Sequence, residues 1–300
     1  MSKPRDTDAI GLCLAGRISP AVALARLLLG GATPATLAEA VAHRRPAGDD
    51  PARTAWTALA TMLDRRRDAM TALSEEIAAT GSNHAALGGA EKAVADIAAF
   101  FDRAVAFSPE ASVALYSLGD PAILADSTAE TLRWLTAQGW LHGGSDVLDF
   151  GCGIGRLAVA MAPRCRSILG LDVSAGMLAE ARRRCAGWPG VRLATATGHG
   201  LADWPDSVFD LVLAADSFPY VVQAGPAAVQ RHIADMARVL RPGGHLVILN
   251  LSYGRDAAAD AADVAEWCGR HDMDAVVVGA RPFTLWDASA FVLQASLERI

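Results

Sequence analysis

Three glycines at alternate positions begin at Gly151, directly after the apolar run 147–150. Glycine is needed where the backbone bends sharply or where a ligand approaches with no Cβ in its way. Asp149 lies two residues before the first glycine, and Asp172 ends the next strand-like run. An acid at that distance, about 20 residues on, holds a ribose by its hydroxyls in nucleotide-binding α/β folds. The spacing predicts a nucleoside cofactor at the first strand–helix turn.

The charge beside the glycines indicates which nucleoside this is. A dinucleotide site reads G-x-G-x-x-G and rests its pyrophosphate on a helix N-terminus. Here the spacing is G-x-G-x-G, and Asp149 stands next to it. A carboxylate there repels a pyrophosphate and attracts an ammonium or a sulfonium. The pattern favours S-adenosylmethionine over NAD, and it disfavours the alternative of an NAD-dependent oxidoreductase.

The segment from about residue 145 to 249 resembles a class I S-adenosylmethionine-dependent methyltransferase. Four stretches agree with that family in order and spacing, namely 147–156, 170–178, 206–212 and 238–246. The resemblance implies S-adenosylmethionine as cofactor, S-adenosylhomocysteine as product, and methyl transfer to an O or N atom of a small molecule. Methyltransferases acting on RNA or protein, and a cofactor-binding regulatory protein without catalysis, are the alternatives.

The resemblance also implies roles for individual residues. Asp149 lies near the methionine ammonium, Asp172 binds the ribose, and Val173 and Met177 flank the adenine. Related enzymes often carry an acid near Thr197 for the adenine amino group; this chain has none, which leaves the Thr197 hydroxyl or backbone groups. The predicted cofactor residues are Asp149, Gly151, Cys152, Gly153, Gly155, Arg156, Asp172, Val173, Met177, Thr197, Gly198, His199, Ala215 and Tyr116.

Candidates for chemistry follow the fourth strand. A general base helps only where the acceptor must lose a proton, and the candidates are Asp216, His199 and Tyr220, in that order. Asp216 is alternatively a solvated loop acid or a helix cap. No metal site is expected. The aromatic candidates for the substrate pocket are Tyr116, Phe218, Tyr253 and Trp286, with core packing as the alternative for each.

Composition limits the class of protein. The chain has 300 residues, 52% hydrophobic content and a formal charge of −6. This charge argues against a general binder of nucleic acid or of membrane surfaces. Five cysteines, an odd number without metal-like spacing, suit a reducing cytoplasm. No stretch approaches the ~20 apolar residues of a membrane span. We expect a cytoplasmic protein that acts on a small molecule, without a nucleic-acid or membrane partner.

The chain divides into a helical beginning and an alternating α/β remainder. Residues 8–16, 19–29 and 34–43 predict short helices, and the apolar spacing from 56 to 77 predicts one long helix. A second apolar stripe runs from Val94 to Val105. We expect a helical region over 1–110, or two parts at 1–45 and 52–110, and a methyltransferase domain over 111–300. The helical region is either a surface for homo-oligomer formation or a plain structural appendage.

The remainder predicts an α/β fold with a doubly wound, mostly parallel sheet. Strands are expected near 146–150, 167–172, 191–195, 209–214, 245–250, 274–279 and 290–296. The last two are joined by a link too short for a crossover helix, so we expect the last strand to be antiparallel. The carboxyl ends of the parallel strands should therefore gather the candidate residues in one crevice.

Overall fold

The computed structural model describes residues 8–48, 51–80 and 90–297. The chain forms two compact units. The helical unit comprises Met1–Ala85, Ser108–Ser127 and Phe283–Asp287, and the sheet unit comprises Ala86–Phe107, Thr128–Pro282 and Ala288–Ile300. The predicted division into domains after residue 110 stays a prediction.

Short helices with well-defined starts build the helical unit. Ser19 and Thr33 accept hydrogen bonds from the backbone N–H groups of Val22 and Thr36, and each is followed by a proline that favours the first helical turn. The helices are α1 (Ala9–Leu14), α2 (Pro20–Leu29), α3 (Pro34–His43), α4 (Pro51–Arg65), α5 (Arg67–Thr80), α7 (Pro109–Val113), the 3₁₀ turn η1 (Leu115–Ser117) and the first part of α8 (Pro121–Ala137).

The predicted long helix at 56–77 is instead two helices, α4 and α5, that meet at Arg66. The break is small, because the Arg66 N–H donates to the Met62 carbonyl and the Arg66 carbonyl accepts from Met70, both at 2.9 Å. The Arg66 guanidinium binds the Leu118 carbonyl at 2.6 Å. The glycine-containing breaks at 81–83 and 88–89 lie outside the described residues.

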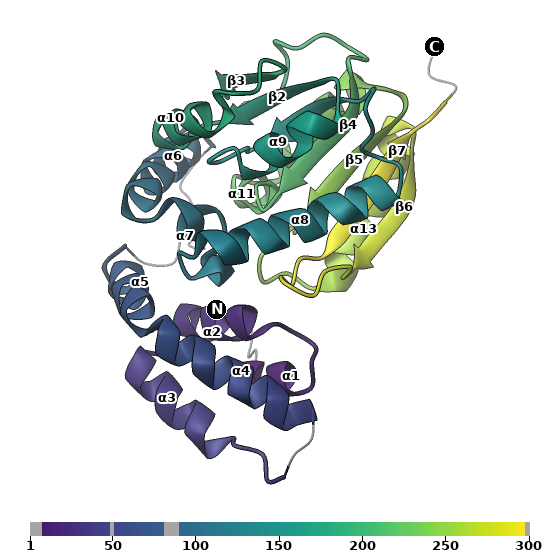
Figure 1. Ribbon diagram of the computed structural model, residues 1–300. Helices are drawn as coiled ribbons and strands as arrows, with labels where there is room; N and C mark the ends of the chain where they lie inside the picture. Colours follow the sequence, from purple (N-terminus) through teal and green to yellow (C-terminus); the bar gives the residue numbers. More distant parts are fainter. Residues whose placement is uncertain (1–7, 49–50, 81–89, 298–300) are drawn as a thin grey trace. The chain divides into compact units, whose positions relative to one another are not determined.

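A seven-stranded sheet in the order β3-β2-β1-β4-β5-β7-β6 forms the sheet unit (Figure 1). The strands β3, β2, β1, β4 and β5 pair in parallel in that order. Strand β7 runs antiparallel between β5 and β6, as the sequence predicts. The strands are β1 (Asp146–Phe150), β2 (Ser167–Asp172), β3 (Val191–Thr195), β4 (Phe209–Ala215), β5 (Leu240–Leu249), β6 (Met273–Ala280) and β7 (Ala290–Ala295).

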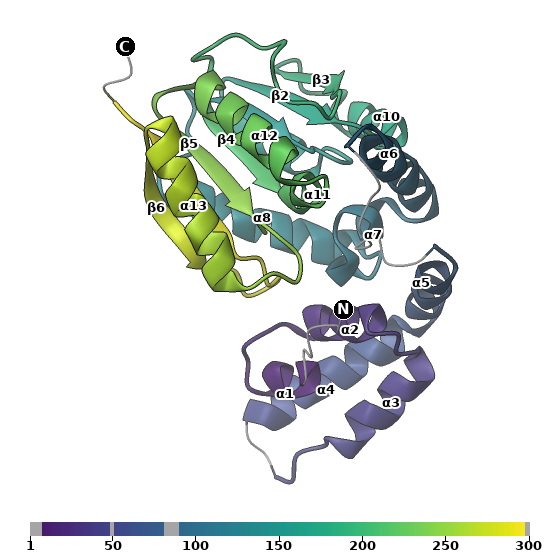
Figure 2. The same ribbon diagram turned by 180° about the vertical axis from the view of Figure 1, so that it is seen from behind.

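Both faces of the sheet are covered, which explains why the central strands β1 and β4 are almost continuously buried. Helices α12 (Pro226–Val239) and α13 (Ala257–His271) lie on one face (Figure 2), and α9 (Arg156–Met161) lies on the other (Figure 1). Leu148, Val212 and Ile248 from the sheet, with Met236 and Trp267 from the helices, belong to one buried core. The sheet unit also contains α6 (Ala90–Phe107), α10 (Ala175–Cys185) and α11 (Phe218–Gln223).

Strand β5 begins at Leu240, five residues earlier than the turn residues 242–244 suggest. Its pairing with β4 is irregular: Phe209 faces Leu240, whereas Leu211 faces His245. Gly243, with φ of 78°, lies in the surplus residues. The surplus residues 241–244 therefore form a bulge within the ladder.

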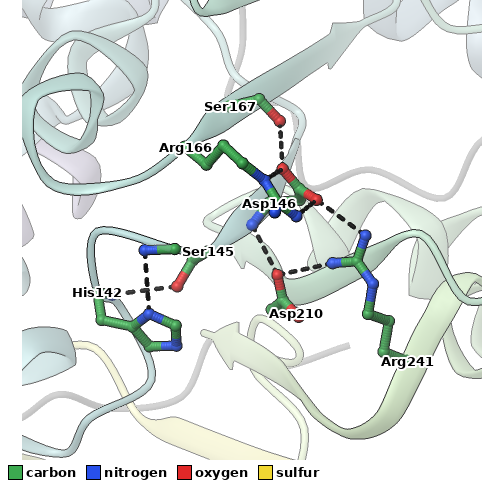
Figure 3. Close-up of polar contacts among 8 residues, drawn as sticks. His142, Ser145, Asp146, Arg166, Ser167, Asp210 and Arg241 are labelled. Atoms are coloured by element: carbon green, nitrogen blue, oxygen red, sulfur yellow. Dashed lines mark hydrogen bonds and ion pairs between the residues drawn. The ribbon is translucent and has the colours of Figure 1, made fainter.

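An ion network joins four strands at the amino-terminal edge of the sheet (Figure 3). The Asp146 carboxylate accepts from the Arg166 guanidinium, from the Ser167 hydroxyl at 2.7 Å and from Arg241 at 2.8 Å. Asp210 accepts from Arg241 and from the Asp146 backbone N–H, both at 2.7 Å. These contacts fix the starts of β1, β2, β4 and β5 against one another, far along the strands from their carboxyl ends.

Among the described residues, none of the helices is both long and apolar enough to cross a membrane.

Candidate cofactor site at the carboxyl edge of the sheet

The glycine loop follows β1 with three residues of positive φ, at 72° for Gly151, 53° for Gly153 and 74° for Gly155. The neighbours that exclude side chains here belong to the protein itself. A Cβ on Gly151 would lie 2.3 Å from the Ser217 Cβ, and one on Gly155 would lie 3.1 Å from the Cys185 sulfur. The protein's own atoms therefore exclude a side chain at Gly151 and crowd one at Gly155.

Asp149 is a buried acid within β1, only 2% exposed. Its Oδ2 has no hydrogen-bond partner among the described residues. Burial raises the pKa of Asp149 to about 7, against the opposing charge of Arg156 and with a further increase from Asp172. A buried carboxylate with an unsatisfied oxygen is costly unless a positive or donating group meets it. The site therefore fits a ligand cation at this position.

Asp172 ends β2 with its carboxylate held in one orientation. Oδ2 accepts the Gly153 N–H at 2.8 Å, and Oδ1 accepts the Ser174 N–H at 2.9 Å. Burial raises the pKa of Asp172, while these backbone donors lower it. Each carboxylate oxygen can accept a second hydrogen bond, so the pair is positioned to meet two neighbouring hydroxyls.

Four more of the predicted cofactor residues lie in or directly after the glycine loop or follow β2, namely Cys152, Arg156, Val173 and Met177. Cys152 is buried with a pKa well above its usual range because of that burial, as expected of a small packing residue. Met177 is 1% exposed on α10, and Val173 is half-buried. Arg156 donates to the Thr128 hydroxyl at 3.1 Å.

The loop after β3 is more open. Thr197 and His199 are exposed, and the Thr197 hydroxyl accepts the His199 N–H at 3.3 Å. Gly198 touches α6, because a Cβ on it would lie 2.5 Å from a Val94 methyl carbon.

Strands β4 and β5 both end in a polar residue with left-handed backbone, Asp216 (φ 58°) and Asn250 (φ 64°). The Asp216 Oδ1 accepts from the Asn250 amide at 2.6 Å and from the Tyr253 hydroxyl at 3.0 Å. Asp216 is thus neither a helix cap nor a free loop acid. Burial, and then the charge of Asp216, raise the pKa of Tyr220 far above its ordinary value. Ala215 lies half-buried just before this cluster.

The predicted pocket aromatics belong to both units of the chain. Phe218 is fully buried in the core, where its ring meets Trp267 at 5.7 Å. Within the helical unit, the Tyr116 ring lies 5.7 Å from Trp286, and the Tyr116 hydroxyl bonds Ser127. Tyr253, 36% exposed, lies beside Asp216.

Three residues beside the candidate site are not predicted from the sequence, namely Asn250, Ser217 and Asp102. Asn250 carried a signal, since it follows the fifth strand as Asp216 follows the fourth. Ser217, whose hydroxyl donates to the Phe150 carbonyl at 2.6 Å, and Asp102 carried none. In the part of the chain that the structure describes, no three His, Cys, Asp or Glu side chains converge as ligands for a metal ion.

Residues 148–248 match the protein family described as "Methyltransferase domain". Over 112 residues the chain is 33% identical to a demethylmenaquinone methyltransferase of Tropheryma whipplei, covering 37% of this chain and 44% of that protein. Over 136 residues it is 34% identical to a phosphatidylethanolamine N-methyltransferase of Cereibacter sphaeroides, covering 45% and 64%. The chain thus spans less than two thirds of the length of each of these relatives.

A solved structure of similar fold is phosphoethanolamine N-methyltransferase 1 of Haemonchus contortus, in complex with phosphoethanolamine and S-adenosylhomocysteine. It is 16% identical, covers 71% of this chain and 51% of its own, and superposes with a TM-score of 0.53. The chain carries a class I S-adenosylmethionine-dependent methyltransferase domain, as the four motifs predict.

Proposed function

We propose that the chain transfers a methyl group from S-adenosylmethionine to an O or N atom of a small-molecule acceptor. The observation that carries the proposal is the pair of acids on either side of the glycine loop. Asp149 has a buried, unsatisfied oxygen, and Asp172 presents two fixed oxygens. Asp149 suits an ammonium, and Asp172 suits the two hydroxyls of a ribose. A pyrophosphate would meet two buried acids, and of the charged groups that act on Asp149 only Arg156 is positive.

The chain's residues mainly bind and align. When bound, S-adenosylmethionine supplies an electrophilic methyl group on a sulfonium. Asp149 and Asp172 hold its two polar ends, while Val173 and Met177 flank the adenine. The fixed loop from Gly151 excludes water and sets the direction of the reacting group. Positioning of this kind is worth effective molarities of roughly 10⁵–10⁸ M.

Asp216 is the first candidate for a general base. Its carboxylate accepts two hydrogen bonds and ends the strand next to β1, beside the glycine loop. Tyr220 ranks below Asp216 as a candidate base, because its raised pKa keeps the phenol protonated at neutral pH, where it donates rather than accepts a proton. His199 is exposed on the loop after β3 and ranks as an adenine-side contact. A positioned base contributes about 10²–10⁴-fold where the acceptor must lose a proton.

The relatives' names support a small-molecule acceptor. They include methyltransferases named for demethylmenaquinone, for ubiquinone biosynthesis and for phosphatidylethanolamine. Tyr253 remains our candidate for the substrate pocket, and the roles of Tyr116 and Trp286 stay predictions, as do a cytoplasmic location and homo-oligomer formation. Phe218 acts through core packing.

Calorimetry with S-adenosylmethionine, S-adenosylhomocysteine and NAD tests the cofactor directly. We expect the first two to bind and NAD to show no heat of binding. Asp172→Ala removes charged acceptors from two hydroxyls and should weaken binding about tenfold or more. Asp203→Ala, at an exposed acid between β3 and β4, is the matched control and should leave binding unchanged. Binding of NAD alone would reject the proposal.

A panel of small molecules with radiolabelled methyl donor tests the reaction. We expect label in one acceptor class and loss of transfer in Asp172→Ala at limiting donor. Tight cofactor binding with no transfer to any small molecule, RNA or protein would instead favour the regulatory alternative.

A further inference from the structure

Three aromatic rings meet beyond the end of β4 within the sheet unit. The ring centroids of Phe101 and Tyr220 lie 5.2 Å apart at 82°, and those of Tyr220 and Tyr253 lie 6.1 Å apart at 80°. Neighbouring rings therefore stand nearly perpendicular and form a corner rather than a stack. Phe101, Asp216 and Tyr220 are half-buried residues, and Tyr253 is exposed. We refer to Phe101, Tyr220 and Tyr253 as the aromatic corner.

The Asp216 carboxylate is held as an acceptor. Asn250 cannot turn its amide around, because its Oδ1 accepts the Ser289 N–H at 3.1 Å. Its NH₂ group must therefore donate to Asp216, as it does at 2.6 Å. The Tyr253 hydroxyl donates to the same oxygen at 3.0 Å. Two donors stabilise the ionised form, so the corner carries a negative charge.

The backbone fixes this charge next to the cofactor loop. Asp216 and Asn250 both adopt left-handed conformations, which most non-glycine residues avoid and which gather at functional sites. The next residue, Ser217, bonds the Phe150 carbonyl and blocks any Cβ on Gly151. The carboxylate is thus one residue from direct contact with the loop.

We propose that Asp216 and the aromatic corner bind the methyl acceptor as an organic cation, so that the acceptor is an amine and nitrogen is methylated. The inference rests on the proposed function and narrows it. A carboxylate and ring faces both attract an ammonium. An anionic acceptor, such as a carboxylate or a phenolate, would be repelled by Asp216.

The transfer step balances with the groups present. The ammonium proton passes to the Asp216 carboxylate and on to water, which frees the nitrogen lone pair. That pair forms the new N–C bond to the methyl carbon, the C–S bond breaks, and its electron pair stays on sulfur.

Binding of trimethylammonium, compared with its neutral counterpart tert-butanol, tests the inference without turnover. Calorimetry or ligand-observed NMR, with and without S-adenosylhomocysteine, should show at least tenfold tighter binding of the cation. Asp216→Asn should reduce cation binding at least tenfold and leave tert-butanol unchanged. Asparagine tolerates the left-handed backbone, so this variant should fold, which its thermal midpoint checks. Phe101→Leu should weaken binding of the cation severalfold. Asp203→Asn is the control variant and should leave the binding of both ligands unchanged.

Equal binding of cation and alcohol, or full cation binding by Asp216→Asn, would overturn the inference. So would methyl label that appears only on hydroxyl acceptors in a panel of amines and alcohols. The two proposals fail separately. If S-adenosylmethionine binds but trimethylammonium does not, the amine assignment is wrong and the methyltransferase stands; absence of S-adenosylmethionine binding rejects both.

Discussion

At the scale of single residues, Asp149 links stability to function. Its burial raises its pKa from 3.8 to about 7, so the folded, ligand-free protein binds a proton that the unfolded chain has already lost. Between these pH values the folded state binds more protons, and its stability therefore falls as the pH rises. Above about pH 7 Asp149 is ionised in both the folded and the unfolded state, and the full cost of burying its charge destabilises the folded state. A ligand ammonium would offset that cost.

Asp149→Asn should remove this dependence. Relative to the variant, the wild-type free energy of unfolding should decline between about pH 4 and 7, by at most about 4 kcal/mol for a shift of three units. At pH 8 the variant should be at least as stable as wild type and bind S-adenosylmethionine more than tenfold more weakly. Urea unfolding at several pH values and calorimetry measure both. A stability difference that is flat with pH would contradict the raised pKa.

Gly151 tests the shape of the loop. Gly151→Ala introduces a Cβ 2.3 Å from the Ser217 Cβ at a φ of 72°, so the loop or α11 must shift. We expect a loss of 2 kcal/mol or more, roughly, because overpacking and positive φ combine, together with loss of cofactor affinity. Gly187→Ala, with no heavy atom within 4 Å, is the control. Thermal melts and cofactor titration decide; a variant that binds normally would show that the loop adapts.

At the scale of elements, α6 reaches the ends of three strands. The Asp102 carboxylate accepts from the Ser174 hydroxyl at 2.6 Å and the Gly176 N–H at 2.8 Å, at the start of α10 after β2. Val94 touches Gly198 after β3, and Phe101 meets Tyr220 after β4. The apolar stripe that the sequence shows from Val94 to Val105 is thus the face that holds the cofactor loops together.

Asp102→Ala should loosen this arrangement. The N-terminus of α10 loses an acceptor for two donors, which costs about 1–2 kcal/mol, and Asp172 loses a fixed neighbour at Ser174. Cofactor affinity should fall severalfold. Asp96→Ala, which removes only an exposed pair with Lys92 on the same helix, should change stability by less than about 0.5 kcal/mol and leave affinity intact. If the two variants behave alike, α6 does not support the site.

At the scale of the whole molecule, each unit is held by contacts between distant segments. In the helical unit, Arg26 pairs with Asp287 at 2.5 Å, which binds the segment Phe283–Asp287 to α2. In the sheet unit, the amino-edge network around Asp146 joins four strands. The network lies opposite the candidate site, so it should support the fold without touching the chemistry.

Asp146→Asn tests that separation. The Arg166 guanidinium, followed by Ser167 and Arg241, holds the pKa of Asp146 well below its usual range. Because the folded pKa is depressed, the stabilisation is present above about pH 4 and is lost as the pH falls below that. We expect the variant to be about 2 kcal/mol less stable from pH 8 to pH 4, with a narrowing gap in stronger acid and unchanged cofactor affinity. Equal stability of the two proteins in urea would contradict this.

Local patterns explain how much could be predicted. The strands around Leu148 and Val212 were visible because buried parallel strands are short apolar runs, and the glycine loop was visible because its conformation is set within a few residues. For Phe218 the sequence leaves both a pocket role and core packing open, because following a strand end does not reveal which way α11 turns its side chains; in the structure Phe218 is buried in the core. Arg66 shows that a small helix break leaves no clear local signal, and Gly243 shows that turn residues can form a bulge within a strand pair.

The sequence by itself determined the order of strands and helices, the glycine loop and the acids at 149 and 172, because each depends on neighbours close along the chain. Only the tertiary structure decided which hydrogen-bond partners those two acids have and which residues surround Asp216. Asn250 is 34 residues from Asp216, and Asp102 is 72 from Ser174. Such contacts arise when packing brings strand ends and α6 together, and no local spacing encodes them.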